Sequence, residues 1–201
     1  MTLYVVKSLL DERGFDRIDR SSAVILLPLD QMELTQRFVE RFVSRRSTVV
    51  AFGSGRLGGQ TLAAGLFSDW FALETNATLD LAGPDGDLMA AMVQRIGRRA
   101  VPLLISLKGD MSAREAVTRG LAGVLVAESS DPLEWFRNWL GGRDLQAFAA
   151  AASLLRVGGG DALERAEFSR LFATGVPQRG LKQFLSKESP DFSEDFEVET
   201  I

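Results

Sequence analysis

Continuous apolar runs alternate with helical patterns through the first two thirds of the chain. The run over 23–27 is apolar throughout and stops at Pro28, and a second such run covers 48–52. Stretches of this length and β-branched content are typical of strands buried in a parallel sheet. Apolar residues at helical spacing lie between the two runs. Residues 23–52 therefore predict a strand, a helix and a strand, which together form the parallel βαβ unit.

Capping signals predict where several helices begin. Asp30, Ser112 and Asp161 are each followed by Glu three residues later, which is the pattern of a capping box. Further helices are expected over 60–67, 88–96 and 101–107, and further strands over 70–73 and 121–127.

The strand pattern ends near residue 129. Helices are expected over 132–156 and 161–187, separated by Gly158–Gly160, and the acidic end of the chain is expected to be loose. Trp135 and Trp139 are four residues apart and predict a packing face on the first of these helices. The predicted organisation is a single domain over 1–192, with an α/β body at about 20–130, a helical arm at 132–192 and an acidic tail at 193–201.

The composition is that of an ordinary globular protein. Of 201 residues, 46% are hydrophobic and 25% are charged, and the net charge is −4. This balance gives no general attraction to nucleic acid or to an anionic membrane. No apolar run approaches the roughly 20 residues that span a bilayer, and the start does not have the form of a secretory signal. A cytoplasmic location is expected, with no nucleic-acid and no membrane partner.

The chain contains no cysteine and no histidine. This excludes a disulfide framework, a thiolate zinc site, a cysteine nucleophile and Ser-His-Asp chemistry. No metal site is expected. Any acid–base chemistry must come from carboxylates, lysines, the single Tyr4, water or backbone amides.

A glycine-rich loop follows the second predicted strand. Gly53 to Gly58 satisfy the pattern G-x-G-x-x-G before a predicted helix. Such a loop brings backbone N–H groups to a dinucleotide pyrophosphate, as in a Rossmann site. The same N–H groups can bind the oxyanion of a thioester enolate. Simple tight turning between strand and helix is the third interpretation.

Three blocks in order resemble the crotonase (enoyl-CoA hydratase/isomerase) superfamily, over about residues 20–192. The first is V-V-A-F-G over 49–53 through Gly58-Gly59 to Asp69, which is similar to A-x-x-G-x-x-x-G-G-G...D. The second runs over 94–121, with Q-R-I-G and then K-G-D-M-S-A-R-E-A. The third comprises E-F at 167–168, G-L-K-Q-F-L-S-K at 180–187 and P-D-F at 190–192.

The resemblance implies an α/β fold, a crotonase-like spiral of ββα units with a C-terminal helical arm. It also implies a homotrimer or a dimer of trimers that binds a coenzyme A thioester as substrate or ligand, with no other cofactor. By position, the oxyanion amides would be those of Leu29 and Gly58. Gly59 and Lys187 would be candidates for binding CoA.

The chain departs from the family where hydratases have their two glutamates. The stretch after the glycines is Gln60-Thr61-Leu62-Ala63, with no acid, and Asp85 after Pro84 is displaced by two residues. Asp85 is the acid/base candidate, with a turn role as its alternative. Asp80 and Asp87 are lesser candidates, and helix capping is the expected role of Asp87.

These features predict an atypical member of the family, a lyase or isomerase that acts on an acyl-CoA or carrier-bound thioester through an oxyanion hole. The alternative is a catalytically silent homologue that binds acyl-CoA or supports a partner enzyme. A Rossmann-type nucleotide-binding protein is the third possibility.

Overall fold

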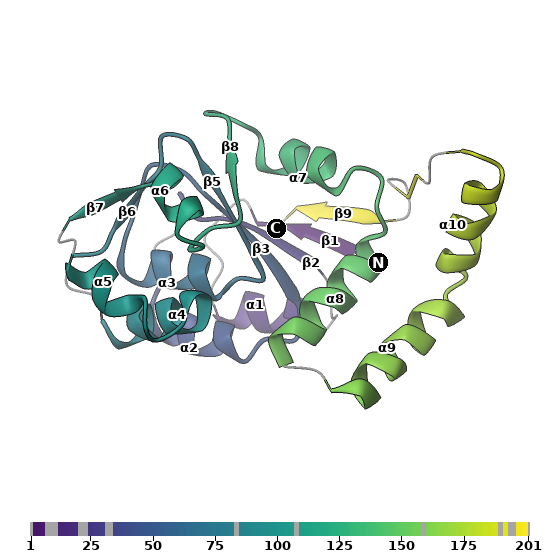
Figure 1. Ribbon diagram of the computed structural model, residues 1–201, viewed down its shortest axis with the longest axis horizontal. Helices are drawn as coiled ribbons and strands as arrows, with labels where there is room; N and C mark the ends of the chain where they lie inside the picture. The colour runs from purple at the N-terminus through teal and green to yellow at the C-terminus, as the bar shows by residue number, and fades with distance from the viewer. Residues whose placement is uncertain are drawn as a thin grey trace.

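A parallel sheet covered by helices on both faces forms the body of the protein, and a pair of helices projects from one side (Figure 1). The computed structural model describes residues 2–6, 12–19, 24–30, 34–82, 85–106, 109–157, 160–188, 191–192 and 196–200. The strands are β1 (Thr2–Val5), β2 (Val24–Pro28), β3 (Thr48–Gly53), β4 (Arg56–Leu57), β5 (Trp70–Glu74), β6 (Thr78–Asp80), β7 (Asp110–Ser112), β8 (Val124–Val126) and β9 (Glu197–Thr200). The helices are α1 (Glu12–Asp19), α2 (Gln36–Val43), α3 (Gly59–Phe67), α4 (Gly86–Ile96), α5 (Val101–Ser106), α6 (Ala113–Thr118), α7 (Pro132–Leu140), α8 (Leu145–Val157), α9 (Asp161–Ala173) and α10 (Val176–Leu185).

The main sheet has the order β8-β5-β3-β2-β1-β9, and all of its pairs are parallel. From β1 to β8 the strands follow one another across the sheet in chain order, so the path winds in one direction. A Rossmann sheet instead reverses direction, and its nucleotide lies where the order reverses. The predicted βαβ unit is confirmed by the pairing of β2 with β3, in which Ile25 lies beside Val49. The strand order therefore excludes the Rossmann-type fold, which was the third possibility from the sequence.

A second, smaller sheet has the order β4-β6-β7. Its strand β4 lies between the glycines that follow β3 and the start of α3, and it pairs with β6 through Leu57 and Leu79. Strand β7 pairs with β6 in the antiparallel direction. The glycine loop therefore does not lead from strand directly to helix, as a dinucleotide fingerprint requires.

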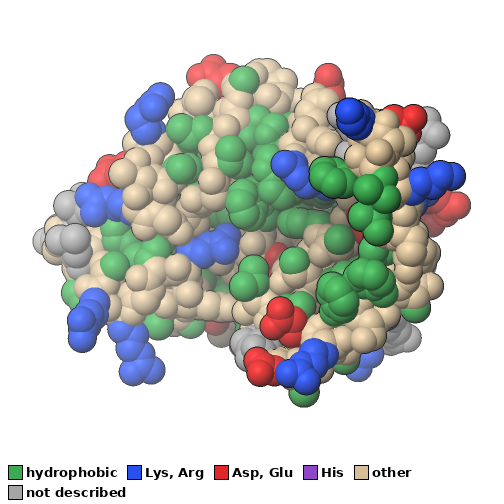
Figure 2. Space-filling view, turned by 45° about the vertical axis from the view of Figure 1, so that its right-hand side comes forward, with side chains coloured by type: hydrophobic (Ala, Val, Ile, Leu, Met, Phe, Trp, Pro, Cys, Tyr) green, Lys and Arg blue, Asp and Glu red, His purple; other side chains and the backbone are tan. Residues whose placement is uncertain are grey.

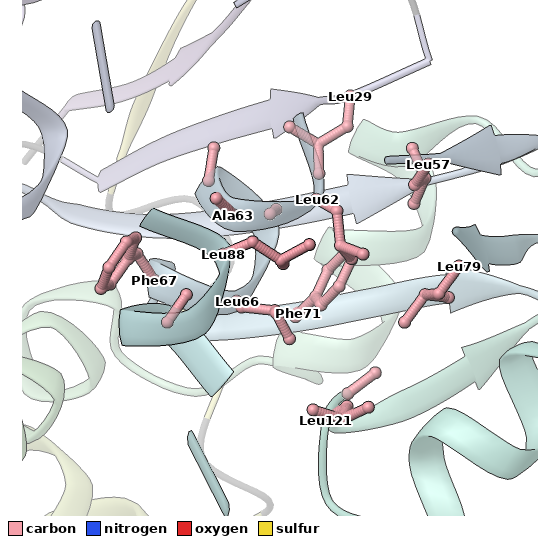
Figure 3. Packing of buried hydrophobic residues seen from close by; sticks show 14 of the residues in the cluster. Leu29, Leu57, Leu62, Ala63, Leu66, Phe67, Phe71, Leu79, Leu88 and Leu121 are labelled. Atoms are coloured by element: carbon pink, nitrogen blue, oxygen red, sulfur yellow. The ribbon is translucent and has the colours of Figure 1, made fainter. Parts of the chain in front are cut away.

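The larger core lies between the main sheet and helices α1 to α4. Figure 3 shows Leu62 and Leu66 of α3 packed with Phe71 of β5 and Leu88 of α4, all of them buried. Gly65 allows this approach, because a Cβ there would lie 2.6 Å from the Phe71 ring. Close packing of α3 fixes the position of its N-terminus, where the candidate site begins.

The opposite face of the sheet is covered by α7 and α8. Phe136, Leu140 and Leu145 are buried against a row of sheet residues. The Trp135 ring packs 5.7 Å from Phe52, and Trp139 belongs to the same cluster, so the two tryptophans form the predicted packing face. The helices from residue 132 onward were expected to form an arm outside the body, but α7 and α8 are part of it. The projecting arm consists of α9 and α10 alone (Figure 1).

Strand β9 adds to the edge of the sheet beside β1, with Leu3 next to Val198. The end of the chain was expected to be loose, and for 197–200 that expectation is wrong. Strand β1 extends the sheet before the predicted start of the body at about residue 20. Strands β1 and β9 form where no hydrophobic pattern predicted them because they pair with each other through the backbone. An edge strand gains ladder hydrogen bonds whatever its polarity.

Asp30 and Asp161 are not the N-cap residues of the helices that follow them. Helix α2 is capped by Thr35, whose hydroxyl accepts a hydrogen bond from the Phe38 N–H; Glu33 lies outside the described residues. Gly160 is the N-cap of α9, and Asp161 is its first residue. Ser112 does cap α6 as predicted, by accepting from the Glu115 N–H.

A buried carboxylate links both layers of helices to the sheet. Asp69 accepts hydrogen bonds from Arg45 at 2.9 Å, from the Val49 N–H at 2.8 Å and from Arg156 at 2.8 Å. The Asp69 side chain is 5% exposed and that of Arg45 is 2% exposed. Burial lowers the pKa of Arg45 from its ordinary value, and the charge of Asp69 opposes that shift. The network joins α2, β3, β5 and α8 at the amino ends of the strands.

Replacing Asp69 by asparagine should destabilise the protein strongly. The Asp69→Asn variant leaves two arginines without their counter-charge, and breaking a buried ion pair in this way costs about 3–5 kcal/mol. Urea denaturation of the variant measures the change. The control is Asp16→Asn, which removes one carboxylate of a half-exposed pair with Arg41 and should cost about 1 kcal/mol or less. Equal losses for the two variants would contradict the structural role of Asp69.

Candidate functional site

The N-terminus of α3 presents backbone N–H groups without a side-chain cap. Gly58 is the N-cap residue, with φ −148 and ψ 173, and no side chain caps the helix there. Its carbonyl accepts from the Leu62 N–H at 3.2 Å, which begins the helical ladder. Within the described residues, the Gly58 N–H has no hydrogen-bond acceptor. Such an N-terminus attracts an anion or a developing oxyanion.

The next residue leaves room for a ligand. Gly59 has φ +51, in the left-handed region that favours glycine, and a Cβ at Gly59 would meet no atom within 4 Å. A side chain at position 58 would be crowded for a different reason, because its Cβ would lie 3.1 Å from the Asp80 Cβ.

Asp85 is held at the same helix N-terminus by a residue that the sequence did not single out. Its Oδ2 accepts from Gln60 Nε2 at 2.7 Å, and Gln60 is the second residue of α3. Its Oδ1 accepts from the Leu88 N–H at 2.8 Å and caps α4. The expected capping role of Asp87 is therefore wrong, because Asp85 fills it. Gln60 therefore links Asp85 to the first turn of α3, which Gly58 begins as the N-cap residue. The Gln60 Oε1 is buried without a partner in the described residues.

Asp80 is engaged by cationic and backbone donors. Its carboxylate accepts from the Ala82 N–H at 2.9 Å and from Arg56 at 2.9 Å, and Arg56 also pairs with Asp110. The Ala82 N–H and the Arg56 guanidinium together hold the pKa of Asp80 below its ordinary value. A carboxylate stabilised in its charged form is a poor proton acceptor, which sets Asp80 apart as a structural group.

The Leu29 amide is not available in this structure. Its N–H donates to the Phe52 carbonyl at 2.8 Å, at the carboxyl edge of the sheet, and its side chain is buried in the larger core (Figure 3). The expected pairing of Leu29 and Gly58 as two oxyanion donors is therefore not present in the structure. The reason is that the chain after β2 continues the ladder with β3 for one more residue.

Lys187 lies far from this N-terminus along the molecule. It follows α10 in a left-handed conformation with φ 61 and is exposed, whereas α3 lies within the body (Figure 1). Within a single subunit, Lys187 therefore does not lie near Gly58. Thr61 and Ala63, the two positions at which the resemblance led us to expect a glutamate, both lie near the start of α3.

The fold is that of the crotonase (enoyl-CoA hydratase/isomerase) structures. An enoyl-CoA hydratase/isomerase from Cupriavidus metallidurans CH34 superposes with a TM-score of 0.71 at 18% identity, covering 92% of this chain and 87% of that one. An enoyl-CoA hydratase from Mycobacterium smegmatis gives a TM-score of 0.66 at 14% identity, covering 90% and 85%. An enoyl-CoA hydratase/carnithine racemase from Magnetospirillum magneticum gives 0.66 at 16% identity, covering 90% and 82%. The crotonase-like spiral predicted from the sequence is confirmed.

In contrast to the structural comparison, comparison by sequence finds no match for this chain. No protein-family model matches the chain, and no curated protein matches it.

In the part of the chain that the structure describes, no helix is long and apolar enough to cross a membrane. Nor do three or more acidic side chains gather there in a way that could hold a metal ion.

Proposed function

We propose that this chain is a divergent crotonase-superfamily protein that binds an acyl thioester, as acyl-CoA or on a carrier protein. The thioester oxygen would lie at the Gly58 N–H, at the N-terminus of α3, with CoA passing over Gly59. The main support is the uncapped N-terminus of α3 with Asp85 held beside it by Gln60. The fold and the three sequence blocks support the choice of ligand.

The proposed reaction is an isomerisation that needs a single carboxylate. Asp85 removes a proton from the carbon next to the thioester carbonyl, and the electron pair moves onto the carbonyl oxygen as an enolate. The α3 amides stabilise this oxyanion. Asp85 then returns the proton to another carbon, so that no water is consumed. Hydration by two carboxylates is not proposed, because Thr61 and Ala63 supply no acid after the glycines.

Asp85→Asn tests the acid–base assignment without removing the cap, because asparagine is as good an N-cap residue as aspartate. Turnover of the best substrate from a panel of acyl-CoAs should fall by about 10²-fold or more, a typical scale for lost general acid–base catalysis. The matched control is Asp87→Asn, which removes the same charge from the first turn of the same helix and should leave turnover unchanged. Unchanged turnover in Asp85→Asn would refute the assignment.

A catalytically silent acyl-CoA binder is the second candidate. Both Asp85 oxygens already accept hydrogen bonds, and residues 60–63 directly after the glycines contain no acid. CoA binding measured by calorimetry without turnover of any thioester would favour this function. Absence of both binding and turnover would contradict the thioester proposal as a whole.

The arm supports self-association, with a homotrimer as the proposed state. Helices α9 and α10 contain no buried residue. Apolar side chains gather on the arm (Figure 2), with Phe168 61%, Phe184 71% and Leu185 72% exposed. Exposed apolar area of this kind marks an interaction surface. In a trimer, Lys187 of one subunit would reach the CoA phosphates bound to another.

Sedimentation velocity at micromolar concentration should show an oligomer for the wild type. The double variant Phe168→Glu/Phe184→Glu should sediment as a monomer, because charges on the arm oppose burial of its apolar face. Val43→Glu is the control, since Val43 is an exposed apolar residue of the body and the variant should remain oligomeric. A wild type that is only monomeric would contradict the proposal.

A further inference from the structure

A cavity of about 660 Å³ opens at the carboxyl edge of the main sheet, next to the loop that leads into α7. Its apolar wall includes Val5, Phe52 and Leu133. Its polar lining consists of three acids and three hydroxyls, namely Asp30, Glu74, Asp131, Ser54, Ser129 and Ser130. The volume falls within the range of about 300–1,000 Å³ that small-molecule sites occupy, and the carboxyl ends of parallel strands are where open α/β sheets bind ligands.

Glu74 is a largely buried residue whose carboxylate faces the cavity. It is the last residue of β5, it is 5% exposed, and it lines the cavity. No hydrogen bond or ion pair joins its carboxylate to any residue that the structure describes, and its oxygens are not fully buried but face the cavity. The carboxylate is therefore open toward the cavity, where it can interact with a bound ligand. A carboxylate only accepts hydrogen bonds, and the partner must therefore be a donor.

The other groups around the cavity favour a cation. No lysine or arginine is among the described residues that line it. The N-terminus of α7 does not supply positive character either, because Asp131 caps it by accepting from the Glu134 N–H at 2.8 Å. Ser130 donates its hydroxyl hydrogen to the Ala127 carbonyl, which leaves its oxygen as an acceptor toward the cavity. A cavity lined by one sign of charge concentrates ligands of the opposite sign.

We propose that this cavity binds an aliphatic polyamine. Its ammonium groups would donate to Glu74 and to the two aspartates, and its methylene segments would pack on Val5, Phe52 and Leu133. A bare metal ion is a poorer match, since the described acids do not converge into a metal-binding cluster. CoA is a poor match as well, because its phosphates would face three carboxylates. Gly58, Gln60 and Asp85 are not among the lining residues, so the proposal is independent of the thioester site.

Titration calorimetry with spermidine in 150 mM salt (roughly physiological ionic strength, which screens surface charge) tests the proposal. Glu74→Gln should weaken binding by about tenfold or more, the scale of one charge-assisted hydrogen bond. The control is Glu128→Gln, which removes the same charge from an exposed residue outside the lining and should bind as the wild type does. The neutral compound 1,8-octanediol should not bind. Equal binding of the diol, equal loss in both variants, or no spermidine binding would overturn the proposal.

Thermal melting shows whether the variant still folds and tests the same claim. Without ligand, Glu74→Gln should melt at or above the wild-type temperature, because no described residue pairs with the charge that it removes. Spermidine should raise the melting temperature of the wild type and of Glu128→Gln, and should raise that of Glu74→Gln by clearly less. If Glu74→Gln instead melts several degrees below Glu128→Gln, Glu74 has a partner within the chain and the proposal fails.

Discussion

The ion-pair network around Asp69 is the constraint on which the arrangement of the body depends. It fixes the amino ends of β3 and β5, which lie side by side at the centre of the sheet, and it attaches α2 and α8 on opposite faces. At its carboxyl end, β3 continues into the loop that leads to Gly58. Strand β5 ends at Glu74, and the next loop begins there. Because the strands are rigid and parallel, holding one end determines where both of these loops emerge. The two candidate sites of the molecule therefore share one structural anchor.

Local sequence patterns predicted the buried elements well. The apolar runs over 23–27 and 48–52 became β2 and β3, and the stretches after them became α2 and α3. What local patterns did not reveal is pairing between distant segments. The strands β4, β6 and β7 have two or three residues each, and β9 is mostly exposed, so none has a hydrophobic signature of its own. Such strands form because a neighbouring edge offers unpaired backbone groups.

The candidate site was predicted in part. Gly58 and Asp85 could be named from the glycine pattern and the family resemblance, and the structure does bring them to one helix end. Gln60 could not be named, because a polar residue in a first helical turn is unremarkable until its partner is known. Leu29 shows the converse, since only the three-dimensional ladder reveals that its N–H is already bonded to Phe52. For Glu74 a signal did exist, namely an acid that ends an otherwise apolar strand, W-F-A-L-E.

The proposed function requires that the N-terminus of α3 binds the thioester oxygen. A crystal structure of the complex with butyryl-CoA tests this requirement directly. That compound has no double bond to isomerise, so it should remain intact in the site. Its thioester oxygen is expected within about 3.2 Å of the Gly58 nitrogen, the range of an N–H···O hydrogen bond. An acyl-CoA bound with its carbonyl away from the N-terminus of α3, or seated in the acidic cavity beside Glu74, would contradict the proposed function.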